Sequence, residues 1–363
     1  MKILRIGSYP TETKGGMGYH AYKISNNLEY ECLYITPYYS DDILKSNANH
    51  EIKLLRFFNS PRPRDPHFIQ KIYHFFKRVY FILEFSAKST MYIFRYKPDI
   101  IHIHSPMFSI VSFIGWLMGK KIYITFHGED FYKIRNNYFY SLSAFIYKDV
   151  FVLSPHMKPY LDTIHDSQNV HIVFNGVDQD IFEDKGKKRN KDFIAVGYLK
   201  KVKGYDFLLK AFKIFCDEYN YSGKLKIAGS GDELENLKNL STSLGLDKKV
   251  IFLGELDNEN LVNLYNQNEF FVLSSLSEGF PKVMLEAMSC GNIVISTDVG
   301  SVKNILEDYP YICMPSDALD LASKMANCFL TDNTDLKRYL KNRVQDFSWS
   351  NSASTYKKVY EKN

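Results

Sequence analysis

Short apolar runs alternate with longer stretches of helical periodicity along the whole chain. Most of these runs are continuously apolar rather than strictly alternating, which is typical of parallel strands buried on both faces. The predicted strands are residues 2–6, 32–36, 100–104, 122–126, 151–153 and 171–174 in the first half, and 193–196, 224–228, 250–253, 270–273, 293–296 and 311–313 in the second. Helical stretches between them predict repeated βαβ units and therefore an α/β fold.

The length of 363 residues predicts two domains, because a single core of that size is uncommon. The clearest boundary follows the motif NGVD at residues 175–178, and the charged stretch 183–190 after it has little to bury. We interpret that stretch as a linker between two Rossmann-like halves. In such folds a ligand lies at the carboxyl ends of the strands, here in a cleft between the halves.

The most informative segment is SEGFPKVMLEAMSCGNIVISTDVG, residues 277–300. A predicted strand ends in a polar loop that carries Glu278, and a helix begins near Pro281. Free N–H groups at a helix start can hold a phosphate. Glu286 lies eight residues after Glu278, so two carboxylates could accept hydrogen bonds from hydroxyls. Residue type alone favours two solvated glutamates, but the whole segment favours a ligand site.

This segment resembles the E-x7-E signature of the retaining glycosyltransferases of family four, also called glycosyl transferases group 1, which have the GT-B fold. Further marks of that family follow in the expected order. They are GGMG at 15–18, KPDIIHIH at 97–104, TFHG at 125–128 with Asp130, NGVD at 175–178, VGYL with KG at 196–204, IAGSG at 227–231, FLG at 252–254 and FSW at 347–349.

The resemblance implies two Rossmann-like domains that face each other across a cleft, with a C-terminal helix that crosses back to the first. We expect an N-terminal acceptor-side domain of residues 1–178 with 347–363, and a nucleotide-sugar-binding domain of residues 179–346.

The resemblance also implies roles for individual residues. Glu278 would lie by the donor sugar, Glu286 would bind the donor ribose, and Lys203 would pair with the diphosphate. The backbone around the sugar and diphosphate would come from Phe280, Pro281, Lys282 and Val283. A cation at the diphosphate would stabilise the charge that the leaving group gains.

Other residues complete the implied site. Gly15 and Gly16 would form a loop facing the donor phosphate, His127 would contact the transferred sugar, and Gly254 to Leu256 would lie near the base. We expect His127, Lys203 and Glu278 to be catalytic. Tyr198 stands where the family usually has Arg, and Lys200 or Lys201 could supply the missing charge.

The implied function is transfer of a hexose-type sugar from a nucleoside-diphosphate sugar, with UDP favoured and GDP possible, to a saccharide or lipid-linked saccharide acceptor with retention. Polysaccharide, lipopolysaccharide or glycolipid synthesis would use such an enzyme. The alternatives are a non-catalytic sugar-nucleotide-binding partner subunit, suggested by Tyr198, and a GT-B nucleotide-sugar epimerase. No aspartate pair of the D-x-D kind and no Cys/His cluster stands out as a metal site in the sequence, so we expect no obligatory metal and no cofactor.

His102 and His104 lie on a predicted strand, and we expect one on each side of it. Packing or hydrogen bonding is favoured there over metal ligation. The five cysteines form no CxxC pair. They favour a reduced, cytoplasmic setting, and no run of 18 apolar residues predicts a membrane span.

Charge is concentrated in one segment. Between Lys53 and Lys97 there are ten Lys and Arg but only two acids, together with twelve aromatic residues. Apolar positions there recur at helical spacing. Two interpretations remain open, namely a helix that lies on an anionic bilayer and a helix that packs on the first domain with a basic rim. Nucleic acid is not expected as a partner, because no binding module accompanies the charge.

Overall fold

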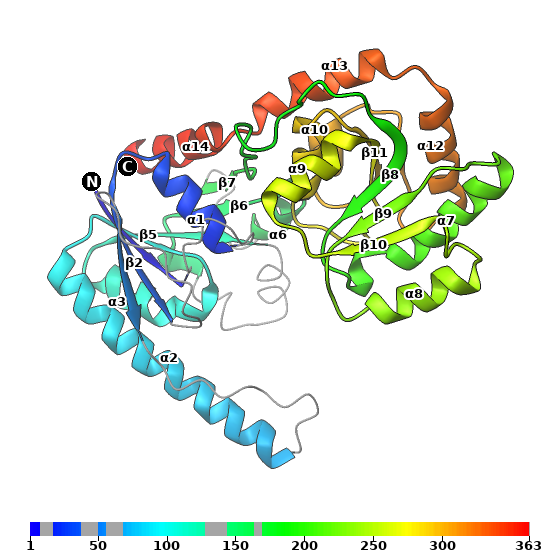
Figure 1. Ribbon diagram of the computed structural model, residues 1–363. Helices are drawn as coiled ribbons and strands as arrows, with labels where there is room; N and C mark the ends of the chain where they lie inside the picture. Colours follow the sequence, from blue (N-terminus) through cyan, green and yellow to red (C-terminus); the bar gives the residue numbers. More distant parts are fainter. Residues whose placement is uncertain (8–16, 38–49, 56–67, 128–143, 163–168, 363) are drawn as a thin grey trace. The chain divides into compact units, whose positions relative to one another are not determined.

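Two α/β units make up the part of the chain that the computed structural model describes, which is residues 1–7, 17–37, 50–55, 68–127, 144–162 and 169–362 (Figure 1). The first unit comprises Met1–Phe174 together with Ser352–Asn363, and the second comprises Asn175–Asn351. Each unit has its own parallel sheet with helices around it, which confirms the predicted α/β class with two Rossmann-like halves.

The first unit is built on a parallel sheet. Among its described residues seven strands pair in the order β3 (His50–Leu55), β2 (Glu31–Pro37), β1 (Lys2–Ile6), β4 (Ile100–Ile103), β5 (Lys121–Phe126), β6 (Asp149–Val152) and β7 (Val170–Ile172). The strand β3 was not predicted. It pairs with β2 at the edge of the sheet, where a strand need not be continuously apolar.

The two faces of this sheet differ in chemistry. One face is apolar and is covered by α2 (Phe68–Tyr96) and α3 (Ser109–Leu117), which contribute Phe85 and Val111 to the core. The other face is polar and aromatic, and it is covered by α1 (Met17–Asn26) and α14 (Trp349–Lys362). On α14, the Tyr356 ring lies 4.2 Å from that of Phe151, between ring centroids. The short helix α6 (Lys158–Leu161) precedes β7, the strand at the other edge of the sheet from β3.

The second unit also has a parallel sheet. Its strand order is β10 (Val250–Gly254), β9 (Leu225–Ala228), β8 (Asn190–Val196), β11 (Asn268–Leu273), β12 (Ile293–Thr297) and β13 (Ile312–Cys313). The helices are α7 (Tyr205–Glu218), α8 (Leu234–Ser243), α9 (Asn258–Gln267), α10 (Lys282–Ser289), α11 (Val302–Leu306), α12 (Ala318–Leu330) and α13 (Thr334–Arg343). A short 3₁₀ turn, η5 (Lys201–Lys203), precedes α7. The order turns back at β8 and β11, which gives the sheet a switch point.

The NGVD motif packs against the FSW motif within the second unit. The Val177 N–H donates to the carbonyl of Phe347 at 2.9 Å. A Cβ on Gly176 would lie 2.4 Å from the backbone nitrogen of Trp349, so the two segments approach closely only because this residue is glycine. The units therefore divide at 174/175 and 351/352, rather than at the predicted 178/179 and 346/347.

The charged stretch 183–190 is an integral part of the second unit, so the prediction of a linker was wrong. Asn266 accepts from the Lys185 N–H at 2.7 Å and donates to the Glu183 carbonyl at 2.9 Å. Arg189 donates to Asp184 at 2.7 Å and to the carbonyl of Tyr265 at 3.0 Å. Charged side chains here bond to backbone carbonyls, which a count of apolar residues does not detect.

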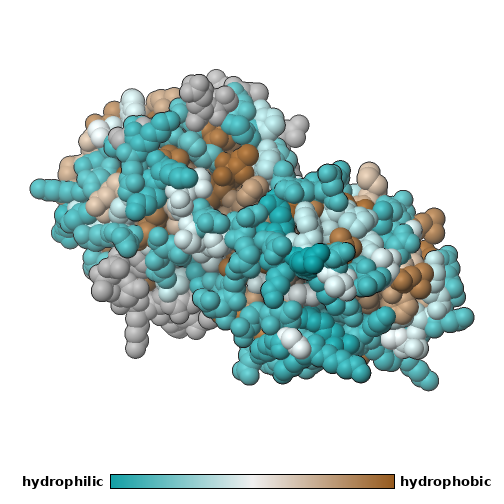
Figure 2. All heavy atoms as spheres, turned by 90° about the horizontal axis from the view of Figure 1, so that it is seen from above, coloured by the Kyte–Doolittle hydropathy of each residue, from teal (hydrophilic) through white to brown (hydrophobic). Residues whose placement is uncertain are grey.

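The face of the molecule seen in Figure 2 is mostly polar. Figure 2 shows a mostly hydrophilic face on which apolar residues occur in separate groups. Within the described residues, none of the helices is both long enough and apolar enough to cross a bilayer.

Candidate active site

Lys203 and Glu278 form an ion pair at the carboxyl ends of β8 and β11. The Lys203 Nζ lies 2.5 Å from the Glu278 Oε1, and the two side chains are 25% and 9% exposed. The Ser275 hydroxyl donates to the same Oε1 at 2.7 Å. The pair brings together two predicted site residues from motifs 75 positions apart, as expected where parallel strands end at one edge of a sheet.

The loops that carry this pair are joined through their backbones. The Leu276 N–H donates to the Val202 carbonyl at 2.8 Å, and the Ser274 hydroxyl donates to the Lys203 carbonyl at 2.9 Å. Gly204 has a φ of 62°, and a Cβ there would lie 2.2 Å from the Ser274 carbonyl oxygen. Glycine therefore permits both the left-handed backbone and the close approach that set the position of Lys203.

Glu286 lies in the middle of α10 and is buried. Its Oε1 is 3.1 Å from the Lys282 Nζ, and its Oε2 accepts a hydrogen bond from the Tyr265 hydroxyl at 3.3 Å. Burial raises the pKa of Glu286, while Lys282 opposes that change. Burial likewise raises the pKa of nearby Asp178 to about 6, against the opposing effect of Lys282 and with a further increase from Glu286. These groups form a buried acidic cluster with one lysine.

The start of α10 presents backbone groups beside the ion pair. Pro281 occupies the position before the helix and has no N–H. The Lys282 N–H donates to the Phe280 carbonyl at 3.0 Å, and the Met284 N–H donates to the Pro281 carbonyl at 3.1 Å. These two bonds tie the start of α10 to the loop that precedes it.

Tyr198 lies just after β8, whereas Gly254 ends β10 and Leu256 follows it, with β9 between these two strands. Tyr198 is 64% exposed, and the Lys200 Nζ lies 5.8 Å from the centre of its ring. The Gly254 carbonyl, at the end of β10, accepts from the Gly229 N–H at 2.7 Å. A cavity of about 330 Å³ opens at this end of the sheet; it is lined by Lys200, Lys201, Tyr205, Asp206, Glu233, Leu237 and Leu276. Lys200 and Lys201 thus border a hollow at this end of the sheet.

His127 follows β5 in the first unit and keeps partial exposure. Its Nε2 is 3.2 Å from the Nδ1 of His104. Burial lowers the pKa of both rings well below the usual histidine value. Gly15, Gly16, Gly128 and Asp130 lie outside the described residues.

His102 and His104 lie on the same face of the first sheet, so the prediction of opposite sides was wrong. Residues two apart along a strand point the same way. Their rings are stacked, with centroids 4.7 Å apart. Each is hydrogen-bonded, His102 to Tyr360 and Thr125 at 2.5 and 2.8 Å. Among the described residues no group of three His, Cys, Asp or Glu side chains could hold a metal ion.

Sequence reasoning missed several residues of these clusters. Arg5 is fully buried beside His104, and Tyr265 and Ser275 bond to the two glutamates. Of these three residues only Arg5 could have been noticed in the sequence, because it interrupts the apolar residues of the strand KILRI. The other two are common residue types whose partners are distant in sequence.

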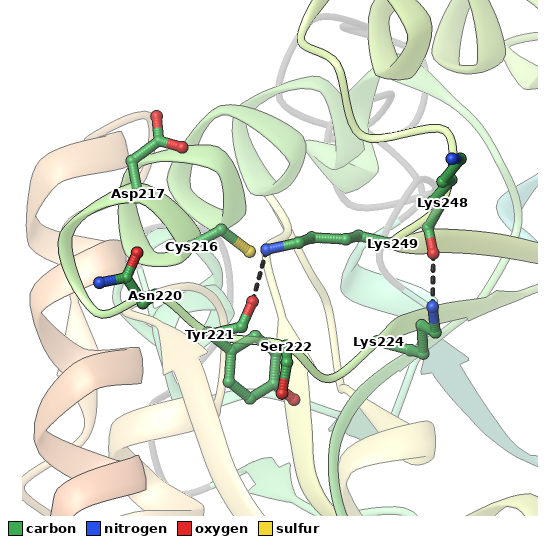
Figure 3. Close-up of a pocket in the computed structure, with 8 residues that line it drawn as sticks. All are labelled: Cys216, Asp217, Asn220, Tyr221, Ser222, Lys224, Lys248 and Lys249. Carbon is green, nitrogen blue, oxygen red and sulfur yellow. Dashed lines mark hydrogen bonds between the residues drawn. The ribbon is translucent and has the colours of Figure 1, made fainter.

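A second hollow of about 490 Å³ lies at the opposite end of the second sheet (Figure 3). Lys224, Lys248 and Lys249 line it, before or at the starts of β9 and β10. The Lys249 ammonium donates to the Tyr221 carbonyl, and the Lys224 ammonium donates to the Lys248 carbonyl at 2.5 Å. The ammonium groups of Lys224 and Lys249 thus have carbonyl partners, and neither motif Glu lies there.

Two parallel-sheet Rossmann-like units define the GT-B fold, and the sequence motifs described above lie at strand ends within them. The family described as "Glycosyl transferases group 1" matches residues 177–346, and "Glycosyltransferase Family 4" matches residues 14–181. The chain belongs to this family of glycosyltransferases, as the resemblance of its motifs predicted.

Individual relatives agree with this assignment. An uncharacterized glycosyltransferase of Haemophilus influenzae is 35% identical over 33% of this chain and 34% of that protein. The N-acetyl-alpha-D-glucosaminyl L-malate synthase of Bacillus anthracis is 24% identical over 72% of this chain and 74% of that protein. The aligned regions thus cover between about a third and three quarters of the length of these two relatives.

Solved structures share the fold. The structure of Anabaena HepE in complex with UDP has a TM-score of 0.76 and 15% identity, and the alignment covers 100% of each chain. At that identity the similarity shows the fold alone.

Proposed function

We propose that the chain is a retaining hexosyltransferase that uses a nucleoside-diphosphate sugar, with UDP favoured over GDP. The acceptor would be a saccharide or a lipid-linked saccharide in the synthesis of a surface polysaccharide, lipopolysaccharide or glycolipid. The Bacillus relative is named an N-acetyl-alpha-D-glucosaminyl L-malate synthase, and the Anabaena structure holds UDP. The first name supports a sugar as the group transferred, and the second supports a uridine nucleotide as its carrier.

The Lys203–Glu278 pair is the observation that carries this proposal. The side chains of Lys203 and Ser275 both contact the Oε1 atom of Glu278. The Oε2 is then the oxygen that would accept from a hydroxyl of the donor sugar. Lys203, which keeps 25% exposure, can turn one of its three N–H donors to a phosphate. Cationic donors fixed beside a leaving diphosphate stabilise the charge that it gains.

Glu286 would bind the donor ribose from its buried position on α10. Its two oxygens already contact Lys282 and Tyr265, but the Tyr265 contact is long at 3.3 Å. A ribose hydroxyl would therefore share Oε2. The start of the same helix would hold the diphosphate, so one element would position both parts of the donor.

Retention would follow a front-face route. The bond between the anomeric carbon and the diphosphate oxygen breaks, the acceptor oxygen bonds to that carbon on the same face, and the diphosphate takes the acceptor proton. The transition state would resemble an oxocarbenium ion. The protein positions the groups and stabilises charge, with His127 against the sugar, and no obligatory metal is needed in this scheme.

The test is a donor panel with and without acceptor. We expect release of nucleoside diphosphate only when both are present, and a product whose anomeric proton coupling in NMR matches that of the donor. Inversion would overturn the mechanism. Binding without release would favour the partner subunit suggested by Tyr198, and release without acceptor would favour an epimerase-like reaction. Glu278→Gln is the matched loss-of-function variant.

The first half of α2 supports a peripheral position at an anionic membrane. Large apolar side chains are exposed along it, namely Ile72, Tyr73, Phe75, Phe76, Val79, Tyr80 and Leu83, at 37–65%. The second half instead packs on the first unit through Phe85 and Ile93. In Figure 1 the first half extends beyond the sheet of the first unit. Its neighbour α3 exposes Phe113 and Leu117 as well.

An anionic bilayer fits this helix better than a protein core does. The segment from residue 53 to 97 carries ten basic and two acidic residues, and basic amphipathic helices bind anionic lipid. A cytoplasmic enzyme that acts on a lipid-linked acceptor would use such a surface at the inner face of the membrane.

Vesicle co-sedimentation tests this position. We expect binding to vesicles with anionic phospholipid, weaker binding to neutral vesicles, and loss of binding in Phe75→Ser with Phe76→Ser. Leu330→Ser is the control, because Leu330 is 65% exposed in the second unit. Equal binding of all variants would contradict the proposal.

A further inference from the structure

A row of three side chains crosses the polar face of the first sheet. Arg5 lies on β1, His104 follows β4, and His127 follows β5. The Arg5 Nη1 is 3.2 Å from the His104 Nε2, and the His104 Nδ1 is 3.2 Å from the His127 Nε2. Arg5 and His104 are fully buried, whereas His127 is partly exposed. Each contact in the row uses a different ring nitrogen of His104.

The direction of the hydrogen bonds is fixed from one end. A guanidinium only donates, so the His104 Nε2 accepts from Arg5. A neutral imidazole that accepts at Nε2 carries its proton on Nδ1. That N–H points to the His127 Nε2, which must accept, and the proton of His127 then lies on its Nδ1.

We propose that Arg5, acting through His104, holds His127 as the neutral tautomer protonated on Nδ1. This inference rests on the proposed function for its meaning, because there His127 contacts the transferred sugar. His127 then serves as a hydrogen-bond donor through Nδ1–H, and it does not carry a proton to or from the acceptor. Arg5 and His104 are positioning residues.

Burial, and after it the neighbouring groups, lowers the pKa of both rings and so favours their neutral forms. Burial lowers the pKa of His104, and His102, Arg5, His127 and His20 lower it further. Burial and then His20 lower the pKa of His127. A second proton on either ring would set two N–H groups against each other along the row, or an N–H against the guanidinium.

Burial of the Arg5 guanidinium lowers the stability of the fold, which indicates that this residue has a role besides filling space. Among the described residues its Nε and Nη2 have no hydrogen-bond partner. A buried cation with incomplete hydrogen bonding costs stability, and an apolar side chain of similar length would fill the strand without that cost. A residue that only filled space would not be arginine.

Nitrogen NMR of histidine-labelled protein tests the proposal. Two-bond proton–nitrogen spectra distinguish the two neutral tautomers, and the signals of His127 are those lost in His127→Asn. We expect the Nδ1–H tautomer in the wild-type protein near neutral pH. A wild-type His127 protonated on Nε2, or on both nitrogens, overturns the proposal without any variant.

Variants then assign the cause. Arg5→Met should free His104 to place its proton on Nε2, so that the Nδ1–H signal of His127 is lost or mixed. Arg5→Lys restores a donor and should restore the signal. Lys2→Met, which removes the exposed basic residue of the same strand, is the control. If Arg5→Met does not fold, His104→Asn serves instead, because its amide can still donate to His127 and should keep the signal.

Activity gives a separate measurement. We expect Arg5→Met to lower kcat/KM about tenfold, the effect of one misdirected hydrogen bond, and Lys2→Met to leave it unchanged. The spectra need no donor or acceptor. A chain with the expected tautomer but no transfer would therefore refute the proposed function and leave the tautomer assignment intact.

Discussion

Replacing Lys203 with alanine removes the cation that the Glu278 carboxylate faces at 2.5 Å. Only the Ser275 hydroxyl would then remain on the same oxygen. Exposed ion pairs contribute about 0–1 kcal/mol, and breaking a buried pair costs about 3–5 kcal/mol. With side chains 25% and 9% exposed, this pair falls between these cases. We therefore expect a loss of about 2 kcal/mol in the free energy of unfolding.

The effect on catalysis should be larger than the effect on stability. If Lys203 stabilises the leaving diphosphate, Lys203→Ala removes one fixed donor, which typically lowers kcat about 100- to 1,000-fold. The assays are nucleoside-diphosphate release in the presence of acceptor and thermal unfolding. A loss of about 2 kcal/mol corresponds to about 4–8 °C in Tm for a unit of this size.

Lys213→Ala is the matched control. Lys213 lies on the helix that follows and pairs with Asp217 at 2.8 Å, but both side chains are exposed. We expect no change in rate and at most about 0.5 kcal/mol in stability. Turnover of Lys203→Ala within a few-fold of wild type, with normal folding, would refute the role assigned to Lys203.

Three further changes test the site. Tyr198→Arg should tighten nucleoside-diphosphate binding by about 1 kcal/mol in calorimetry, because a fork donor replaces a side chain that is 64% exposed; unchanged affinity would contradict this. Gly204→Ala should cost more stability in denaturant than Gly245→Ala, since both have positive φ (62° and 68°) but a Cβ meets the Ser274 carbonyl at 2.2 Å only in the former; equal losses would show that the close approach is unimportant. Asp178→Asn should raise Tm at pH 8 but not at pH 4. The folded pKa of Asp178 is about 6 against an ordinary 3.8, so its ionised form destabilises the fold above pH 6, and that penalty disappears as pH falls towards 4. An equal gain at both pH values would contradict this explanation.

The hydrophobic pattern predicted most strands because buried parallel strands are continuously apolar. It failed for β3, which mixes polar and apolar residues at the edge of the sheet. It also failed for the stretch 183–190, where the Lys185 N–H and the Arg189 side chain bond to residues distant in sequence. Spacing placed Glu278 at a strand end beside a helix start, but it could not show that Lys203 faces Glu278. That contact depends on how two loops meet, which is decided by tertiary packing.

The histidine row marks another limit of sequence reading. The two-residue repeat of a strand places His102 and His104 on one face, but the partners of His104 lie on β1 and just after β5. Strand order is needed to bring Arg5 beside His104, and it is set by crossover connections rather than by local sequence.

The path of the chain between the two units has a consequence for biosynthesis. The Ser352 hydroxyl donates to the Phe174 carbonyl at 2.7 Å, so the outgoing and returning segments lie side by side in the first unit. The second unit is therefore an insertion within the first. During synthesis on the ribosome, residues 175–351 are complete while the first unit still lacks α14, whose Tyr356 and Tyr360 cover the histidine face. The first unit is thus finished after the second, and its interior closes only when the residues of α14 have emerged.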